Sequence, residues 1–188
     1  MVATILSSLR NTVIAGFVLA FVVFLLYLTR AEFVNAVFWP FFVRWMHIVS
    51  GIMWIGHLWY FNFVQTPTMP KIPDELKRGV SGYIAPAALF WFRWGAMVTF
   101  LSGLLLFTLI FLYTPGVGFG MNPLMKGAEG LTDRARWIMW GMLFGSIMWF
   151  NVWFVIWPRQ KMIVAAAQGG PAVENAAAVA RRAFLASR

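Results

Sequence analysis

The sequence predicts an all-α integral membrane protein, and three observations support this prediction. Of its 188 residues, 61% are hydrophobic and only 11% are charged. A soluble domain of this length needs a polar surface that so few charged side chains cannot supply. The apolar residues gather into four long runs, and the charged residues lie mainly at the ends of these runs. Lipid is therefore the expected environment of most of the chain.

Each of the four apolar runs is long enough to cross a bilayer as a helix, which needs roughly 17–25 residues. The runs predict a four-transmembrane-helix bundle with helices at about 12–28, 41–64, 87–113 and 137–157. The first run exceeds the roughly 7–15 apolar residues of a signal peptide, and no small-residue cleavage motif follows it. We therefore expect it to be a retained anchor.

The second connection carries signals for a helix end and a helix start. Pro67 is expected to break the second helix. Pro73, followed by the acidic residues Asp74 and Glu75, is typical of a first helical turn. The connection thus predicts a short interfacial helix, after which Pro86 is expected to start the third span.

The remaining connections are simpler. The loop over 114–133 is rich in glycine but lacks the strand-then-helix setting of a phosphate-binding loop, so we expect no nucleotide there. Thr132 and Asp133 are typical of the N-cap and first turn of the fourth helix. We expect residues 1–158 to form the membrane domain. Residues 159–188 should form a basic cytoplasmic tail with a short helix from about Pro171.

The formal net charge of +9 does not indicate a nucleic-acid partner, because the basic residues occur singly at the ends of apolar runs. They are better explained as topology signals and contacts with lipid phosphates. Placing both termini in the cytoplasm puts nine Lys and Arg residues inside and five outside. The positive-inside rule favours this orientation.

Two histidines, His47 and His57, are the whole histidine stock of the chain, and both lie in the second apolar run. On one helix they are about 15 Å apart and about 80° apart in direction, so they cannot bind one metal ion together. Each could ligate a separate haem b, since neutral imidazole is a good iron ligand. The alternative is that each histidine hydrogen-bonds a neighbouring helix.

Other parts of such a site can also be proposed from the sequence. The chain has no cysteine, so a haem could not be attached covalently. A second iron ligand would have to be a methionine or come from another subunit, or the iron would have no second protein ligand. The methionine candidates are Met97, Met139 and Met142.

The arginines within or near the predicted spans are the next candidate site residues, because a charge buried in lipid is costly and often functional. Arg44 lies one turn from His47 and could neutralise a haem propionate, although it could also extend to the membrane surface. Arg93 lies farther inside its span and could hold an anion. Asn62, Gln65 and Asn151 are further polar residues in or near the spans. The pair Gly141 and Gly145 is typical of helix packing.

Four stretches resemble the N-terminal membrane domain of the bacterial membrane-bound urate oxidases. They are RWMHIVSGIMWIGHLWYFNFVQTPTMPKIP, IAPAALFWFRWGAMVTFLSGLLL, WPRQKMI and ARRAFLASR. The resemblance implies a multi-helix protein of the bacterial cytoplasmic membrane that takes part in purine catabolism. It implies conversion of urate to 5-hydroxyisourate, with electrons passing to a cytochrome c, and a functional role for His47.

Three hypotheses follow. The first is a membrane redox protein of the urate oxidase type that binds haem through His47 and passes electrons to a cytochrome c. The second is a non-catalytic subunit of a larger respiratory or photosynthetic complex that binds a haem or a pigment. The third is a purely structural helical bundle. The lipid bilayer and either other membrane subunits or further copies of the chain are the expected partners. The sequence does not decide whether the chain is an enzyme, and it identifies no catalytic residue.

Overall fold

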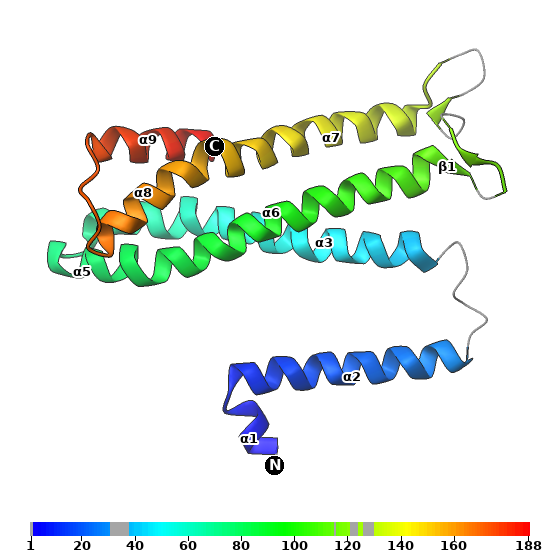
Figure 1. Ribbon diagram of the computed structural model, residues 1–188, viewed down its shortest axis with the longest axis horizontal. Helices are drawn as coiled ribbons and strands as arrows, with labels where there is room; N and C mark the ends of the chain where they lie inside the picture. The colour runs from blue at the N-terminus through cyan, green and yellow to red at the C-terminus, as the bar shows by residue number, and fades with distance from the viewer. Residues whose placement is uncertain (1, 31–37, 115, 121–123, 126–129) are drawn as a thin grey trace. The chain divides into compact units, whose positions relative to one another are not determined.

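In a computed structural model of the chain, the structure describes residues 2–30, 38–114, 116–120, 124–125 and 130–188. The described chain is all-α apart from one short hairpin (Figure 1). It divides into two compact units, Met1–Phe41 and Phe42–Arg188.

The first unit contains α1 (Val2–Leu6) and α2 (Leu9–Arg30). The Thr12 hydroxyl ties the two helices together, because Oγ1 lies 3.0 Å from the carbonyl oxygen of Ile5 and 3.1 Å from that of Ser8. The α2 helix is apolar on all sides, as expected of a helix that faces lipid.

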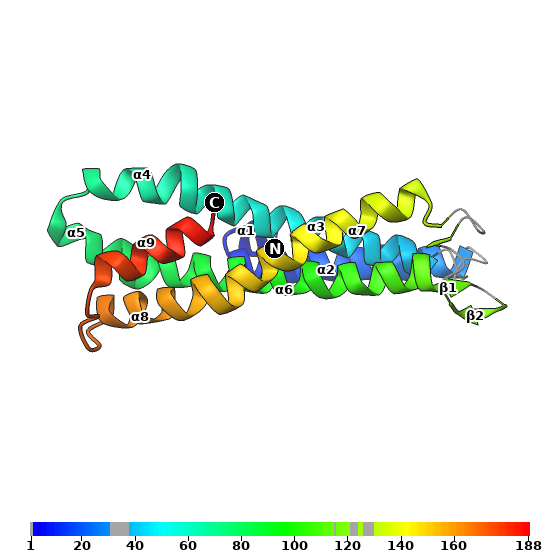
Figure 2. The ribbon, with the colours of Figure 1, turned by 90° about the horizontal axis from the view of Figure 1, so that it is seen from above.

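The second unit is built on three long helices that run side by side (Figures 1 and 2). The first of them begins with α3 (Phe38–Trp59) and continues without a break through π-helical turns at Tyr60–Gln65 and α4 (Thr66–Thr68). A 3-10 turn, Met69–Lys71, ends it. The prediction that Pro67 breaks this helix is therefore wrong.

The second long helix runs from Asp74 to Leu112 as one continuous element. Its parts are α5 (Asp74–Gly79), a π-helical segment (Val80–Ile84), α6 (Ala85–Phe107) and a second π-helical segment (Thr108–Leu112). Asp74 and Glu75 do lie in the first turn, as predicted. However, the predicted interfacial helix is not a separate element, and Pro86 does not start the span.

The third long helix runs from Asp133 to Ala167. It consists of α7 (Asp133–Phe150), a π-helical segment (Asn151–Ile156) and α8 (Trp157–Ala167). The predicted N-cap is confirmed, since the Thr132 side chain accepts a hydrogen bond from the backbone N–H of Ala135 at 3.1 Å. The fourth predicted helix therefore starts earlier and ends later than its apolar run.

Proline explains why three helix ends differ from the predicted ones. Its ring clashes with the carbonyl group four residues earlier and removes one backbone hydrogen bond. Pro67, Pro86 and Pro158 each follow a π-helical segment by two residues. A wider turn makes room for the ring and lets the helix continue.

A short hairpin and a C-terminal helix complete the second unit. Tyr113–Thr114 (β1) pairs antiparallel with Gly118–Phe119 (β2) in the glycine-rich loop. The C-terminal helix α9 (Ala176–Ala186) folds back beside α8 (Figure 1). Ala183 of α9 is buried in the main apolar cluster with Trp54, Leu89 and Phe92. The predicted basic tail thus packs on the helices through this face.

Three helices of the described chain are long and apolar enough to cross a membrane, namely Leu9–Tyr27, Asp74–Leu112 and Asp133–Ala167. These correspond to the first, third and fourth predicted spans. The α3 helix has 22 residues but is not among the three. Arg44, His47 and His57 lower its average hydropathy, so its length alone does not identify it as a span.

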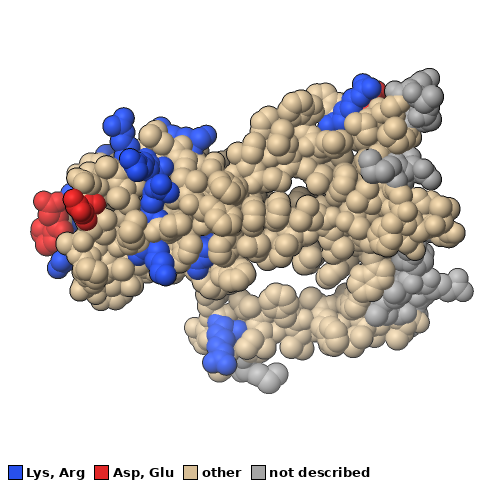
Figure 3. Space-filling view, turned by 45° about the horizontal axis from the view of Figure 1, so that its top comes forward, with Lys and Arg blue, Asp and Glu red and all other residues tan. Residues whose placement is uncertain are grey.

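Few charged residues lie on the surface of the middle of the second unit. In Figure 3 the Lys and Arg side chains of this unit gather toward its two ends, with a largely uncharged surface between them. The end that holds α5, α8 and α9 carries most of them, and α7 begins with Arg134 and Arg136 at the other end. This distribution suits a helical bundle whose middle lies in lipid.

Candidate cofactor site

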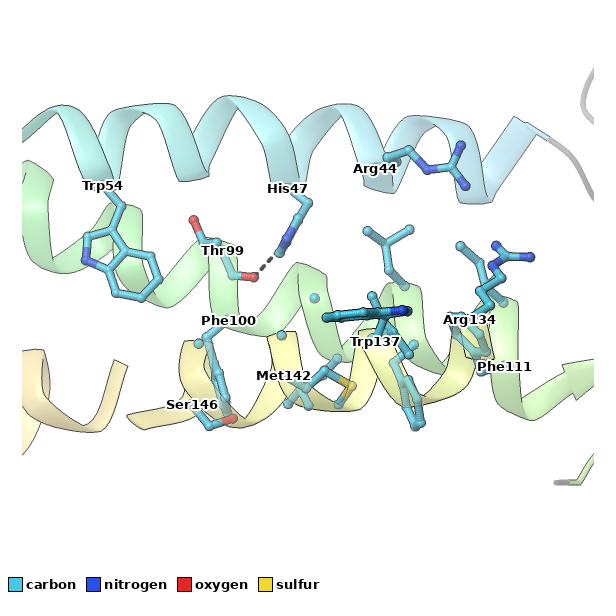
Figure 4. A pocket seen from close by; sticks show the side chains of 18 residues that line it. Arg44, His47, Trp54, Thr99, Phe100, Phe111, Arg134, Trp137, Met142 and Ser146 are labelled. Carbon is cyan, nitrogen blue, oxygen red and sulfur yellow. Dashed lines mark hydrogen bonds between the residues drawn. The ribbon is translucent and has the colours of Figure 1, made fainter. Parts of the chain in front are cut away.

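A cavity of about 770 Å³ lies between α3, α6 and α7 (Figure 4). We call it the His47 cavity. Among the residues that line it are Arg44, His47 and Trp54 of α3, Thr99, Phe100 and Gly103 of α6, and Arg134, Trp137, Gly141, Met142 and Gly145 of α7. Its volume falls within the range of roughly 300–1,000 Å³ that is usual for small-molecule and cofactor sites.

His47 is held in one orientation by the neighbouring helix. Its Nδ1 atom lies 2.9 Å from the carbonyl oxygen of Thr99 and 3.1 Å from Oγ of Ser102. A carbonyl oxygen can only accept, so Nδ1 carries the proton and donates it. In neutral imidazole this leaves Nε2 with a free lone pair. Histidines that ligate metals usually have this arrangement, with the other ring nitrogen bonded to a carbonyl or carboxylate.

Gly103 makes the close approach of His47 to α6 possible. A Cβ atom at this position would lie 3.1 Å from Cε1 and 3.5 Å from Nδ1 of His47. The first distance is tighter than ordinary van der Waals contact, so the imidazole would have to move. The absence of a side chain at Gly103 therefore helps to set the position of the ring.

Two arginines lie toward one end of the same cavity. Arg44 comes from α3 and Arg134 from the start of α7, and both are exposed (Figure 4). Neither forms an ion pair with a carboxylate in the part of the chain that the structure describes. The guanidinium of Arg134 lies 5.0 Å from the centre of the Phe111 ring. Both arginines are thus available to an anionic group.

The α7 wall of the cavity is open at Gly141 and Gly145, the two residues that the sequence predicts to pack against another helix. A Cβ atom added at Gly141 or Gly145 would meet no atom within 4 Å, leaving its own helix backbone aside. The prediction that these glycines pack a helix is not met within the described residues, because both line the cavity. Met142 lies between them in sequence and also lines the cavity, whereas Met97 and Met139 do not.

His57 lies outside the His47 cavity. Its Nδ1 is 2.7 Å from the carbonyl oxygen of Met53 on the same helix. It lines a separate, shallower depression that also includes Gly56 and Tyr60. The structure therefore separates the two histidines, as their spacing predicted, and only His47 has a neighbouring helix as its bonding partner.

Arg93 is also outside the His47 cavity. Its guanidinium lies over the Trp157 ring, 3.5 Å from the ring centre, and 5.7 Å from the centre of Trp153. Its Nη1 atom is buried without a hydrogen-bond partner among the described residues. This geometry favours a packing role between α6 and α8, while its predicted role in holding an anion stays a prediction.

We expect Arg93→Gln to destabilise the bundle without changing what binds in the His47 cavity. Loss of a cation–π contact should cost about 0.5–2 kcal/mol. Thermal unfolding of the protein in detergent would show this as a lower midpoint. Arg78→Gln is the matched control, since Arg78 is exposed on α5. If Arg93→Gln instead removed a bound cofactor at unchanged stability, Arg93 would be part of a ligand site.

The sequence does not indicate several residues that line the cavity or hydrogen-bond His47. Thr99 and Ser102 are 52 and 55 positions away from His47, so no local pattern could pair them with it. Trp137 does carry one signal, because adjacent arginine and tryptophan residues recur in the sequence at Arg44–Trp45, Arg93–Trp94 and Arg136–Trp137. Arginine and tryptophan also gather at membrane interfaces, so this recurrence does not by itself indicate a site.

These features define an all-α protein with helices able to cross a membrane and a cofactor-sized cavity that holds an oriented histidine. Comparison with known families identifies it further: residues 125–187 match the family described as urate oxidase N-terminal. This match confirms the resemblance seen in the sequence for the C-terminal part of the chain. Neither the curated proteins nor the solved structures gave a significant match.

Proposed function

We propose that the chain is a membrane redox domain of the urate oxidase type that binds haem b in the His47 cavity. The observation that carries this proposal is the geometry of His47. Its Nδ1–H is bonded to the Thr99 carbonyl, so Nε2 is free to ligate iron. The family match supports a role in urate oxidation.

The residues around His47 suit a haem in four ways. The cavity volume of about 770 Å³ suits a cofactor, and its walls are mainly apolar. Gly141 and Gly145 leave the α7 wall without a side chain at these two positions, so a flat macrocycle could lie against it there. Arg44 and Arg134 can bind two propionates. Met142 lines the same cavity and would be a candidate for a second iron ligand.

The protein groups would bind and tune the cofactor rather than perform acid–base chemistry. Haem, when bound, would supply one-electron transfer. Thr99 fixes the imidazole tautomer, the arginines neutralise negative charge, and the apolar walls exclude water. Oxidation of urate to 5-hydroxyisourate adds the oxygen of one water and releases two electrons and two protons. A cytochrome c is the proposed acceptor of the electrons.

We further propose that α3 also spans the membrane, which would bring the number of spans to four. Both termini would then lie in the bacterial cytoplasm. The end of the second unit with α5, α8 and α9 carries eight Lys and Arg residues. The opposite end, among described residues, carries Arg44, Arg134 and Arg136. The positive-inside rule then directs the His47 cavity toward the periplasm, where a cytochrome c could reach it.

Reporter fusions test this topology. An alkaline phosphatase fused after Arg188 should be inactive and a fluorescent protein at the same site should be bright, because only the former needs the periplasm. Fusions within 114–133 should give the reverse result. An active phosphatase after Arg188 would reverse the proposed orientation.

A non-catalytic subunit of a larger respiratory or photosynthetic complex is the second candidate, with the cavity holding a haem or pigment. The observation that favours it is the open surface at Gly141 and Gly145, which another helix could cover. That helix could belong to another membrane subunit or to a second copy of the chain.

The absorption spectrum of the purified protein tests the proposal as a whole. A Soret band with a pyridine haemochrome of the b type is expected, since the chain has no cysteine for covalent attachment. A urate turnover assay with oxidised cytochrome c then separates the urate oxidase reading from the non-catalytic one. Protein prepared with haem supplied but lacking any Soret band would contradict both.

A further inference from the structure

The depression beside His57 is separate from the His47 cavity and has the size of a small-molecule site. Its volume is about 400 Å³, and it shares no lining residue with the His47 cavity. Sites for small molecules usually measure roughly 300–1,000 Å³. We call it the His57 depression. Its described lining residues are Ile52, Met53, Gly56, His57 and Tyr60 of the first long helix and Ala88 of α6.

His57 offers a hydrogen-bond acceptor to this depression. Its Nδ1 atom lies 2.7 Å from the carbonyl oxygen of Met53, and a carbonyl oxygen only accepts, so Nδ1 carries the proton. In neutral imidazole Nε2 then has a free lone pair. The ring makes no other hydrogen bond with the described residues. A ligand with an O–H group would therefore find a vacant acceptor here.

Tyr60 offers a second polar group. It follows His57 by three residues, so the two side chains lie near the same face of the helix. Both are half-buried, and both line the depression. The Tyr60 hydroxyl can donate or accept, and no described residue hydrogen-bonds it. Together the two side chains can bond two oxygens of one ligand.

The surroundings of the depression restrict the ligand to a neutral, lipid-soluble molecule. This step rests on the proposed membrane position of α3, in which His57 lies about 20 Å from Arg44 along the helix axis, within a hydrocarbon layer of roughly 30 Å. None of the described lining residues carries a full charge. A Cβ atom at Gly56 would meet nothing within 4 Å, so a flat ring can approach the backbone there.

We propose that the His57 depression binds a quinol, the reduced form of a membrane quinone. A quinol is lipid-soluble and neutral, and its flat ring carries two hydroxyl groups. One hydroxyl donates to Nε2 of His57, and the other bonds the Tyr60 hydroxyl. The oxidised quinone has only carbonyl oxygens, so it can bond Tyr60 but has no hydrogen to donate to Nε2. His57 therefore distinguishes the two forms.

Calorimetric titration of the full chain in detergent tests this difference. The probes are a quinol with a short isoprenoid tail, kept reduced without oxygen, and the matching quinone. We expect one quinol per chain. His57→Leu should weaken quinol binding about tenfold, in keeping with the loss of one hydrogen bond, and should leave quinone affinity unchanged. Tyr60→Phe should weaken the binding of both forms.

Two results with His57→Leu would overturn the proposal. One is quinol affinity equal to that of the wild type, and the other is an equal loss of affinity for both forms. The matched controls are Tyr83→Phe and His47→Ala, since neither residue lines the His57 depression. Both control variants should bind quinol like the wild type.

Gly56→Leu tests the location of the site independently of hydrogen bonding. Because a Cβ atom at Gly56 meets no neighbour, this variant should unfold at the wild-type temperature while its side chain occupies the depression. It should bind neither form. Wild-type quinol affinity in Gly56→Leu would show that the ligand lies elsewhere.

Two comparison ligands test whether the ring oxygens are recognised. An alkylbenzene has the ring without oxygen, and a long-chain alcohol has one hydroxyl without the ring. Both should bind far more weakly than the quinol, and equal binding of either would overturn the proposal. The haem spectrum and the reporter fusions test the proposed function separately. Absence of quinol binding in the wild type would therefore overturn this inference alone.

Discussion

His47→Ala is expected to lose at least about nine-tenths of the haem absorbance of the wild type, because it removes the only imidazole in the His47 cavity. Changes to groups that merely support a metal ligand already lower affinity by about 10–100-fold, so loss of the ligand itself should have a larger effect. The measurement is the Soret absorbance at matched protein concentration. Added imidazole should partly restore the band, because it can occupy the space left by the side chain.

His57→Ala is the matched control for this prediction. His57 lies on the same helix, but its ring bonds the Met53 carbonyl and lines a different depression. It should therefore keep the wild-type spectrum. Equal haem content in wild type and His47→Ala would show that His47 serves only to bond α3 to α6. The two variants thus separate a ligand role from a structural one.

The helical class of the protein could be predicted from the sequence because it depends on local composition. Long apolar runs must form helices or barrels in lipid, since their backbone groups find no water there. Three of the four predicted spans correspond to helices that meet the length and hydropathy requirement. The helix ends were less predictable. Pro67, Pro86 and Pro158 are all accommodated by wide turns that depend on how each helix is packed.

The site was predictable only where a residue type is rare. His47 and Arg44 stand out in an apolar run, and the structure brings both to one cavity. Thr99, Ser102 and Gly103 are ordinary residues of an apolar helix. Their importance comes from the side of α6 that faces His47, which is a property of tertiary packing. Arg93 stands out equally in sequence, yet it stacks on Trp157 away from this cavity.

Gly103→Val is expected to lower haem affinity about tenfold or more, although residue 103 itself carries no ligand atom. A Cβ at this position would lie 3.1 Å from Cε1 of His47, and the two Cγ atoms of valine add further crowding. Overpacking of this kind typically costs about 1–3 kcal/mol, and each 1.4 kcal/mol is roughly a tenfold change in affinity. Titration of haem into the cofactor-free protein measures the effect.

The imidazole cannot relieve this crowding without another loss. Its Nδ1–H is bonded to Thr99 and Ser102, which lie one turn and one residue before Gly103 on the same helix. Moving the ring away from residue 103 would lengthen these bonds and leave Nδ1 without its acceptor. Gly103→Ala should therefore have a smaller effect in the same direction. Gly56→Ala is the control, because a Cβ there meets nothing within 4 Å and lies outside the His47 cavity. A normal haem affinity in Gly103→Val would show that the position of the His47 ring does not govern binding.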